Sequence, residues 1–177
     1  SSRSSSDVWA DDMSNLKQVA ASMGVTTGAG SIIEGERNMR LTRYPHYILP
    51  SIESHEITAS LSEAGYYSLT PLAQPLVEAE DSSASITWLL TTSDSAYAKQ
   101  AAMSRTTTEK EDGDTDGPFN VAALSEKGGK LFWVTSDTLL DSYVDSAVSG
   151  ANSNLFMNAL NYMCEQEESI SIRAKSL

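Results

Sequence analysis

The run ASITWLLTTS at residues 84–93 places the strongest constraint on the fold, because it has high β-propensity and is apolar on both sides. A strand with one face in water alternates apolar and polar residues, whereas a strand covered on both faces does not. The pattern is therefore typical of a buried parallel strand. Helix and strand patterns alternate along the rest of the chain, which favours an α/β protein with a largely parallel sheet and helices on both faces.

Three segments have the periodicity of helices. Residues 11–23 place apolar side chains at helical spacing and are followed by Gly24, a residue suited to a helix end. A second helix is predicted over 54–65, with Ser54 as its cap. A third begins at Asn152 or Ser153, and one stripe of it is apolar. That stripe consists of Leu155, Phe156, Ala159, Leu160 and Met163.

Further strands are predicted on both sides of the central run. The Lys-Gly-Gly turn at 127–129 joins two of them into an antiparallel pair. Residues 37–50 are expected to form an irregular crossing, 66–80 an extended segment with two prolines, and 94–117 a mobile polar loop. The predicted strands are 30–36, 118–125, 130–135 and, at an edge of the sheet, 169–175.

Composition limits the class of protein. A length of 177 residues favours one domain, which we expect to span 11–177 after a disordered end at 1–10. The net charge of −12, from 12 Lys and Arg against 24 Asp and Glu, argues against nucleic-acid binding and against docking on anionic lipid. No apolar run is long enough to span a bilayer, and residues 1–10 lack the apolar core of a signal peptide.

Four polar residues follow two of the predicted strands. Ser93 and Asp94 come after one strand, and Ser136 and Asp137 come after another. Ligands collect at the carboxyl ends of strands in open α/β sheets, so these are the candidate ligand-binding residues. Helix capping explains the same residues without a ligand. An alternative function is an α/β hydrolase-like or amidotransferase-like enzyme that uses Ser93 or Ser136, although neither serine lies in a G-x-S-x-G motif.

An acidic loop offers a weak candidate site for calcium. Asp112, Asp114 and Asp116 alternate as in the first half of a calcium-binding loop. The position that should hold a bidentate Glu is occupied by Ala123, so the loop is not an EF-hand. A solvated acidic turn is the favoured interpretation.

Histidine and cysteine do not form a metal-binding pattern. His46 and His55 are the only histidines, and His55 lacks the second histidine of an H-E-x-x-H motif. Cys164, the one cysteine, is predicted to be a buried or half-buried structural residue. The arginines at 37, 40 and 43 are expected to pair with acidic neighbours. The sequence therefore predicts no metal, no cofactor and no catalytic residues.

The order of several runs resembles a known family. These runs are NLKQVAASMGVTTGAGSIIEGE, YPHYILPSIESHEITASLSEAGYY, WLLTTSDSAY, GPFNVAALSEKGGKLFWVTSD, NSNLFMNALNYM and SISIRAK. Together they resemble the gliding-motility GldG-like auxiliary component of ABC transporters, a family that shares a domain with an intraflagellar-transport protein. The resemblance covers residues 12–175.

The resemblance implies a fold and a function. The family domain is Rossmann-like, so a flavodoxin-like three-layer sandwich is expected here, truncated at its N-terminus. Family members are not known as enzymes. The expected function is thus a non-catalytic binding or interaction domain on the extracytoplasmic face of the cell membrane, anchored by transmembrane segments outside this chain. Its expected partner is an ABC transporter membrane subunit or another protein, and a small-molecule ligand is a further candidate. A cytoplasmic scaffold like the intraflagellar relative is a weaker alternative.

Overall fold

The central run forms a strand, but its neighbours are antiparallel. The structure, a computed structural model, describes residues 14–80, 82–99 and 107–164. β8 (Ser85–Thr91) pairs with β11 (Asn120–Glu126) on one side and β5 (Ser51–Ile52) on the other. β11 also pairs with β12 (Lys130–Val134) and, near its start, with β7 (Leu76–Glu78), which in turn pairs with β1 (Val25–Thr27).

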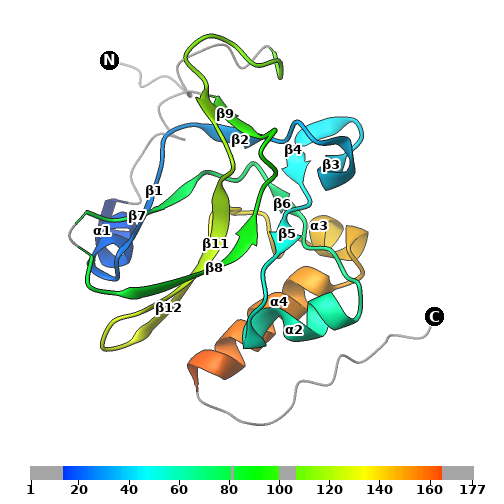
Figure 1. The fold of residues 1–177 in the computed structure, drawn as a ribbon. Helices are drawn as coiled ribbons and strands as arrows, with labels where there is room; N and C mark the ends of the chain where they lie inside the picture. The colour runs from blue at the N-terminus through cyan, green and yellow to red at the C-terminus, as the bar shows by residue number, and fades with distance from the viewer. Residues whose placement is uncertain (1–13, 81, 100–106, 165–177) are drawn as a thin grey trace, which may run out of the picture.

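Two small sheets extend from this main sheet (Figure 1). One has the order β10 (Thr115–Asp116), β9 (Tyr97–Lys99), β2 (Ser31–Ile33). The other has the order β3 (Arg40–Leu41), β4 (Tyr44–Ile48), β6 (Thr70–Pro71). Every strand pair among the described residues is antiparallel, so the predictions of a largely parallel sheet and of a Rossmann-like or flavodoxin-like three-layer sandwich are wrong. The observed fold is mixed α/β with three antiparallel sheets.

Burial on both faces explains why β8 looked like a parallel strand. Leu89 and Leu90 belong to the main core, while Ile86 and Trp88 pack against a second cluster around Ala123. A register shift in the β8–β11 pairing lets two consecutive leucines enter one core. Cover on both faces requires an apolar strand whatever the direction of its neighbours, so the sequence pattern does not determine that direction.

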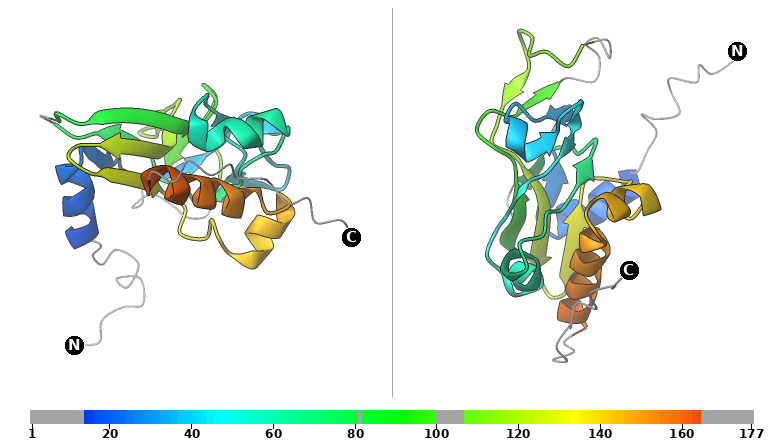
Figure 2. Two further views of the ribbon diagram at one scale, coloured as in Figure 1. Left: turned by 90° about the horizontal axis from the view of Figure 1, so that it is seen from below. Right: turned by 90° about the vertical axis from the view of Figure 1, so that its right-hand side faces the viewer.

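The described residues form four α-helices. They are α1 (Ser14–Ser22), α2 (Glu56–Glu63), α3 (Ser142–Ala147) and α4 (Ala151–Met163), and a short 3₁₀ helix spans Arg37–Met39. α2 and α4 lie side by side in both views of Figure 2, and their buried residues Ile57, Leu61 and Leu155 join the main core. No helix in the described ranges is long and apolar enough to cross a membrane.

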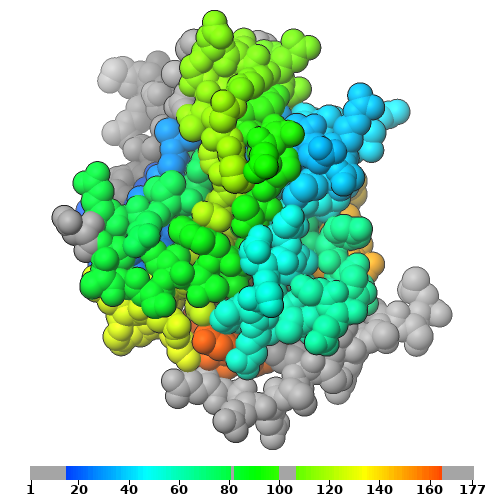
Figure 3. Space-filling view, in the orientation of Figure 1, coloured from blue at the N-terminus to red at the C-terminus, as the bar shows by residue number. Residues whose placement is uncertain are grey.

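The surface seen in Figure 3 is formed by segments far apart in the chain. Residues of β8, in green, lie beside the segment that contains β5, in cyan. The predicted strands at 84–93, 118–125 and 130–135 and the turn between the last two are confirmed. The predicted strand at 169–175 and the predicted disordered end at 1–10 lie outside the described residues.

Two helix starts differ from the prediction. α2 is capped by His55 rather than Ser54: the His55 Nδ1 atom accepts from the Ile57 amide at 3.2 Å. α4 begins after Gly150, and Asn152 lies inside its first turn. Asn152 is fully buried and bonds to distant backbone groups, which is why it does not act as a cap.

Candidate functional site

Ser93 is held by a buried carboxylate. Its hydroxyl donates to Glu34 Oε1 at 2.5 Å, and its amide donates to Glu34 Oε2 at 3.1 Å. Glu34 is 1% exposed and also accepts from the Glu36 amide at 2.8 Å. The three bonds satisfy a carboxylate that would otherwise be costly to bury, and they tie the end of β8 to the segment after β2. Asp94 beside it is exposed.

Ser136 has a similar structural partner. Its buried hydroxyl donates to the carbonyl oxygen of Pro71 at 2.7 Å, whereas Asp137 is exposed. β8 and β12 run in the same direction because each is antiparallel to β11, so Ser93 and Ser136 follow strand ends that point the same way. β11 separates the two strands, and no hydrogen bond among the described residues links the two pairs. Their role in ligand binding stays a prediction.

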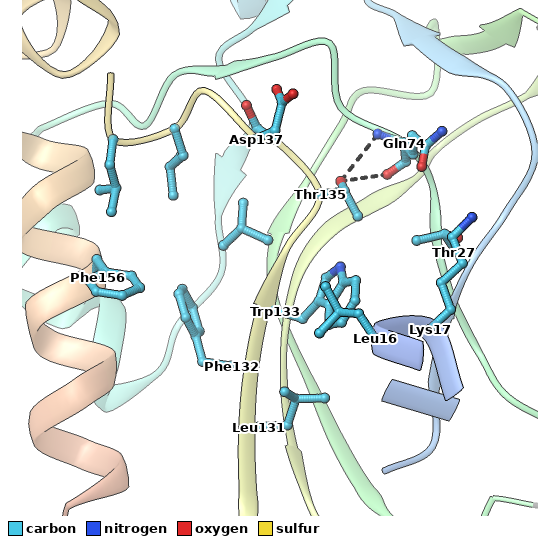
Figure 4. A pocket seen from close by; sticks show the side chains of 14 residues that line it. Leu16, Lys17, Thr27, Gln74, Leu131, Phe132, Trp133, Thr135, Asp137 and Phe156 are labelled. Atoms are coloured by element: carbon cyan, nitrogen blue, oxygen red, sulfur yellow. Dashed lines mark hydrogen bonds between the residues drawn. The ribbon is translucent and has the colours of Figure 1, made fainter. Parts of the chain in front are cut away.

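An apolar groove of about 450 Å³ runs along β12. Figure 4 shows Phe156 of α4 and Phe132 on one side, with Trp133, Leu131 and Leu16 of α1 on the other. At one end, the Thr135 hydroxyl accepts from the backbone amide of Gln74 at 3.2 Å and donates to the backbone carbonyl of Gln74 at 2.7 Å. Ser136 and Asp137 belong to the lining of this groove, which Ser93 and Asp94 do not reach.

The groove follows an edge of the main sheet. Among the described residues, β12 pairs with β11 alone, so its other edge borders the groove. Leu16 and Leu140 at the rim are 46% and 47% exposed. An apolar hollow beside an uncovered strand edge is suited to an extended segment of polypeptide, because the backbone can pair with the edge while side chains fill the hollow.

The acidic loop pairs with a lysine side chain of the same protein, Lys99. The Lys99 ammonium contacts Glu111 at 2.8 Å and Asp114 at 3.2 Å, and Asp114 also accepts from the Glu111 amide at 2.8 Å. The hydrogen bond to Glu111 raises the pKa of Lys99. Asp116 pairs with Lys110. The carboxylates of Asp114 and Asp116 therefore neutralise lysines, and no group of ligands suited to a metal is found in the described ranges.

The histidines and the cysteine lie apart from the serines. His46 packs against Tyr44 and Tyr47, and burial lowers its pKa. The His55 ring is 5.1 Å from the Tyr162 ring. Within the described part of the chain, neither histidine hydrogen-bonds to Ser93 or Ser136. Cys164 is exposed at the end of α4, so the prediction of a buried or half-buried cysteine is wrong.

Glu34 is the residue that sequence reasoning missed. It follows the apolar residues of β2 and precedes Gly35, and a carboxylate at the end of a short buried strand is a signal that could have marked it. Gly35 has a packing reason as well: a Cβ atom there would lie 2.3 Å from the carbonyl oxygen of Ser95. Glu34, through its hydrogen bonds, and Gly35, through its close packing, thus fix the backbone around Ser93.

Comparison with known proteins identifies a fold. The solved structure of the mmIFT52 N-terminal domain matches 88% of this chain with a TM-score of 0.55 and 13% sequence identity. The chain spans 60% of that domain's length. No family model matches the chain, and no curated protein matches it in sequence.

The chain is therefore an α/β protein whose fold is similar to that of the mmIFT52 N-terminal domain. At 13% identity the similarity concerns the fold alone. The expected relation to an intraflagellar-transport protein is confirmed at that level, whereas the GldG-like family is not matched by any family model.

Proposed function

We propose that this chain is a non-catalytic interaction domain that binds a protein partner through the groove along β12. The observation that carries the proposal is the combination of an apolar hollow with an uncovered strand edge. The finer form of the proposal follows the GldG-like resemblance: the partner is an ABC transporter membrane subunit, and the domain lies on the extracytoplasmic face, anchored by segments outside this chain.

The hydrogen bonding of the two serines supports a role without catalysis. Ser136 donates to a backbone carbonyl, and Ser93 donates to a carboxylate that is itself used by two backbone amides. A hydrolytic serine needs a base that can accept its proton and a nearby group that stabilises negative charge. Histidine is the side chain that most often acts as a general base, and the rings of His46 and His55 contact the rings of Tyr47 and Tyr162.

One observation favours the hydrolase alternative. Glu34 Oε1 lies 2.5 Å from the Ser93 hydroxyl, a geometry in which a carboxylate could accept a proton. To test it, a panel of ester, amide and glycoside substrates is assayed with the wild type, Ser93→Ala and Ser136→Ala. The proposal expects no turnover that depends on either serine. Turnover abolished by Ser93→Ala would contradict the non-catalytic proposal.

The partner proposal has its own test. A candidate ABC transporter membrane subunit in detergent is co-purified with the wild type, with Leu140→Glu, which places a charge at the rim of the groove, and with Tyr67→Glu. Tyr67 is 63% exposed and does not line the groove, so it is the matched control. Binding that is lost in Leu140→Glu and kept in Tyr67→Glu supports the groove as the interface. Equal binding by all three proteins would contradict it.

A further inference from the structure

Three arginines around the hairpin of β3 and β4 have no acidic partner. Arg37 belongs to the 3₁₀ helix, Arg40 begins β3, and Arg43 lies in the turn before β4. In the part of the chain that the structure describes, no carboxylate lies within 4.0 Å of these guanidinium groups, so the expected pairing with acidic neighbours is not found. A guanidinium group offers five N–H donors and no acceptor, so it is suited to a ligand that only accepts hydrogen bonds.

A bulge in β4 gathers three aromatic rings next to these arginines. The pairing of β3 with β4 shifts register between Arg40 and Leu41, which leaves the middle of β4 without a counterpart in β3. Neighbouring side chains of a regular strand point to opposite faces, and a bulge changes the direction of a side chain. Here the Tyr47 ring lies 5.0 Å from the His46 ring and 5.5 Å from the Tyr44 ring. The three rings therefore form one cluster.

Hydrogen bonds to neighbouring segments hold the bulge in place. The Pro45 carbonyl accepts from the Glu34 amide, and the His46 carbonyl accepts from the Leu72 amide, both at 2.8 Å. Leu72 has a φ of 52°, which is uncommon for a residue with a side chain, and it is 53% exposed. Such backbone conformations cluster at functional sites. A strained residue thus presents an apolar side chain to solvent beside His46.

We propose that the three arginines and the three rings form a binding surface for an acidic segment of a partner protein. The segment carries carboxylates on both sides of an apolar residue: the carboxylates bind the guanidinium groups, and the apolar residue packs against Tyr44 and Leu72, which are 52% and 53% exposed. β3 and β4 lie at the upper right of Figure 1, away from β12. The inference therefore goes beyond the proposed function and does not depend on the groove.

Arg40 is the central residue of this surface. The residue is half-buried, and its Nε atom is buried without a hydrogen-bond partner among the described residues. Burying part of a charged group is costly unless an opposite charge or a hydrogen bond compensates for it. A carboxylate bound to this guanidinium supplies the missing charge. Because partly buried pairs are screened less by salt, it should attract a carboxylate more strongly than the exposed Arg37 and Arg43 do.

The tyrosine hydroxyls add further donors to the surface. Neither the Tyr44 nor the Tyr47 hydroxyl forms a hydrogen bond within the described ranges. A tyrosine combines an apolar ring with a hydroxyl that can donate to a carboxylate. The surface thus offers donors and apolar contacts together, which matches a segment that mixes acidic and apolar residues.

Charge favours an acidic protein segment over a nucleic acid. The chain has a net charge of −12, so a long row of phosphates attracted by three arginines would be repelled by the rest of the protein. A short acidic segment brings its carboxylates only to the place where the arginines are. Planar guanidinium groups also match the geometry of carboxylates, because two parallel N–H···O bonds can form.

The test is isothermal titration calorimetry of the full chain with the peptide Glu-Asp-Leu-Glu-Glu and its neutral counterpart Gln-Asn-Leu-Gln-Gln. At low ionic strength the wild type should bind the acidic peptide at least tenfold more tightly than the neutral one. The double variant Arg37→Gln, Arg43→Gln changes two exposed residues and should bind the acidic peptide at least tenfold more weakly than the wild type does. The matched control, Lys17→Gln with Lys127→Gln, removes the same charge from exposed positions elsewhere and should change binding less than twofold.

Four outcomes would overturn the inference. Equal affinity of the wild type for the two peptides would mean that the surface does not recognise carboxylates. Equal losses in the arginine and lysine variants would mean that only the overall charge matters. Tighter binding of single-stranded DNA of the same net charge would assign the surface to nucleic acid. Loss of acidic-peptide binding in Leu140→Glu would place the peptide in the groove, which would contradict this inference and leave the proposed function standing.

Discussion

Asn152 uses its side chain to pair with the backbone of Leu69 as a neighbouring strand would. Asn152 Oδ1 accepts from the Leu69 amide at 3.0 Å, and Nδ2 donates to the Leu69 carbonyl at 2.9 Å. The Asn152 side chain also accepts from the Ser68 hydroxyl through Oδ1 and donates to the Leu139 carbonyl through Nδ2. A buried polar side chain thus fastens the first turn of α4 to a segment 83 residues away in sequence.

Replacing Asn152 by alanine is expected to lower the free energy of unfolding by roughly 3 kcal/mol or more, because several buried backbone groups would lose their partners. Chemical denaturation of the purified variant measures the loss. Asn161→Ala is the matched control, since Asn161 is on the same helix and half-buried, and it should cost less than about 1 kcal/mol. Equal losses in the two variants would contradict this role of Asn152.

The face of α4 toward the core can be tested at two adjacent residues. Leu155 is 0% exposed, whereas Phe156 is half-buried and lines the groove. Leu155→Ala should cost about 2–5 kcal/mol, and Phe156→Ala should cost less, about 1–2 kcal/mol, because part of its ring is already in water. Thermal and urea unfolding of both variants give the comparison. A larger loss for Phe156→Ala would show that the groove is closed over that ring.

Calcium is expected to leave the stability of the protein unchanged. The carboxylates of Asp114 and Glu111 both pair with the Lys99 ammonium, so a divalent cation would have to displace that group. A specific site loaded at a hundred times its dissociation constant would add about 2.7 kcal/mol, which calorimetry detects readily. Lys99→Met supplies the contrast: it removes the internal cation, and any calcium-dependent rise in Tm should be greater in this variant than in the wild type. A clear rise in the wild type would overturn the assignment.

The sequence could predict elements whose signals are local. The strands at 118–125 and 130–135 combine β-propensity with a Lys-Gly-Gly turn, and such a turn specifies an antiparallel pair without help from distant residues. The direction of β8 relative to its other neighbour could not be predicted, because burial on both faces gives the same apolar pattern in parallel and antiparallel sheets.

The candidate site and the buried side chains that support the fold were harder to predict because their parts meet through tertiary contacts. Asn152 has the sequence context of a helix cap, yet its partners are Ser68, Leu69 and Leu139. Glu34 bonds to Ser93, 59 residues away. The groove depends on which edge of β12 is left uncovered, and that edge is determined by the order of strands rather than by any one segment.

The last prediction concerns the pH dependence of stability through His46. Burial lowers the pKa of His46 below 6.5, so the unfolded chain binds a proton at this residue more readily than the folded chain does. Stability is therefore lost as the pH falls through 6.5 toward the folded-state pKa, and none is lost from this source at pH 8. His46→Leu removes the titration and keeps an apolar side chain beside Tyr47. Urea unfolding at pH 8 and pH 5 should show a smaller decrease in the variant than in the wild type, and an identical decrease would contradict the assignment.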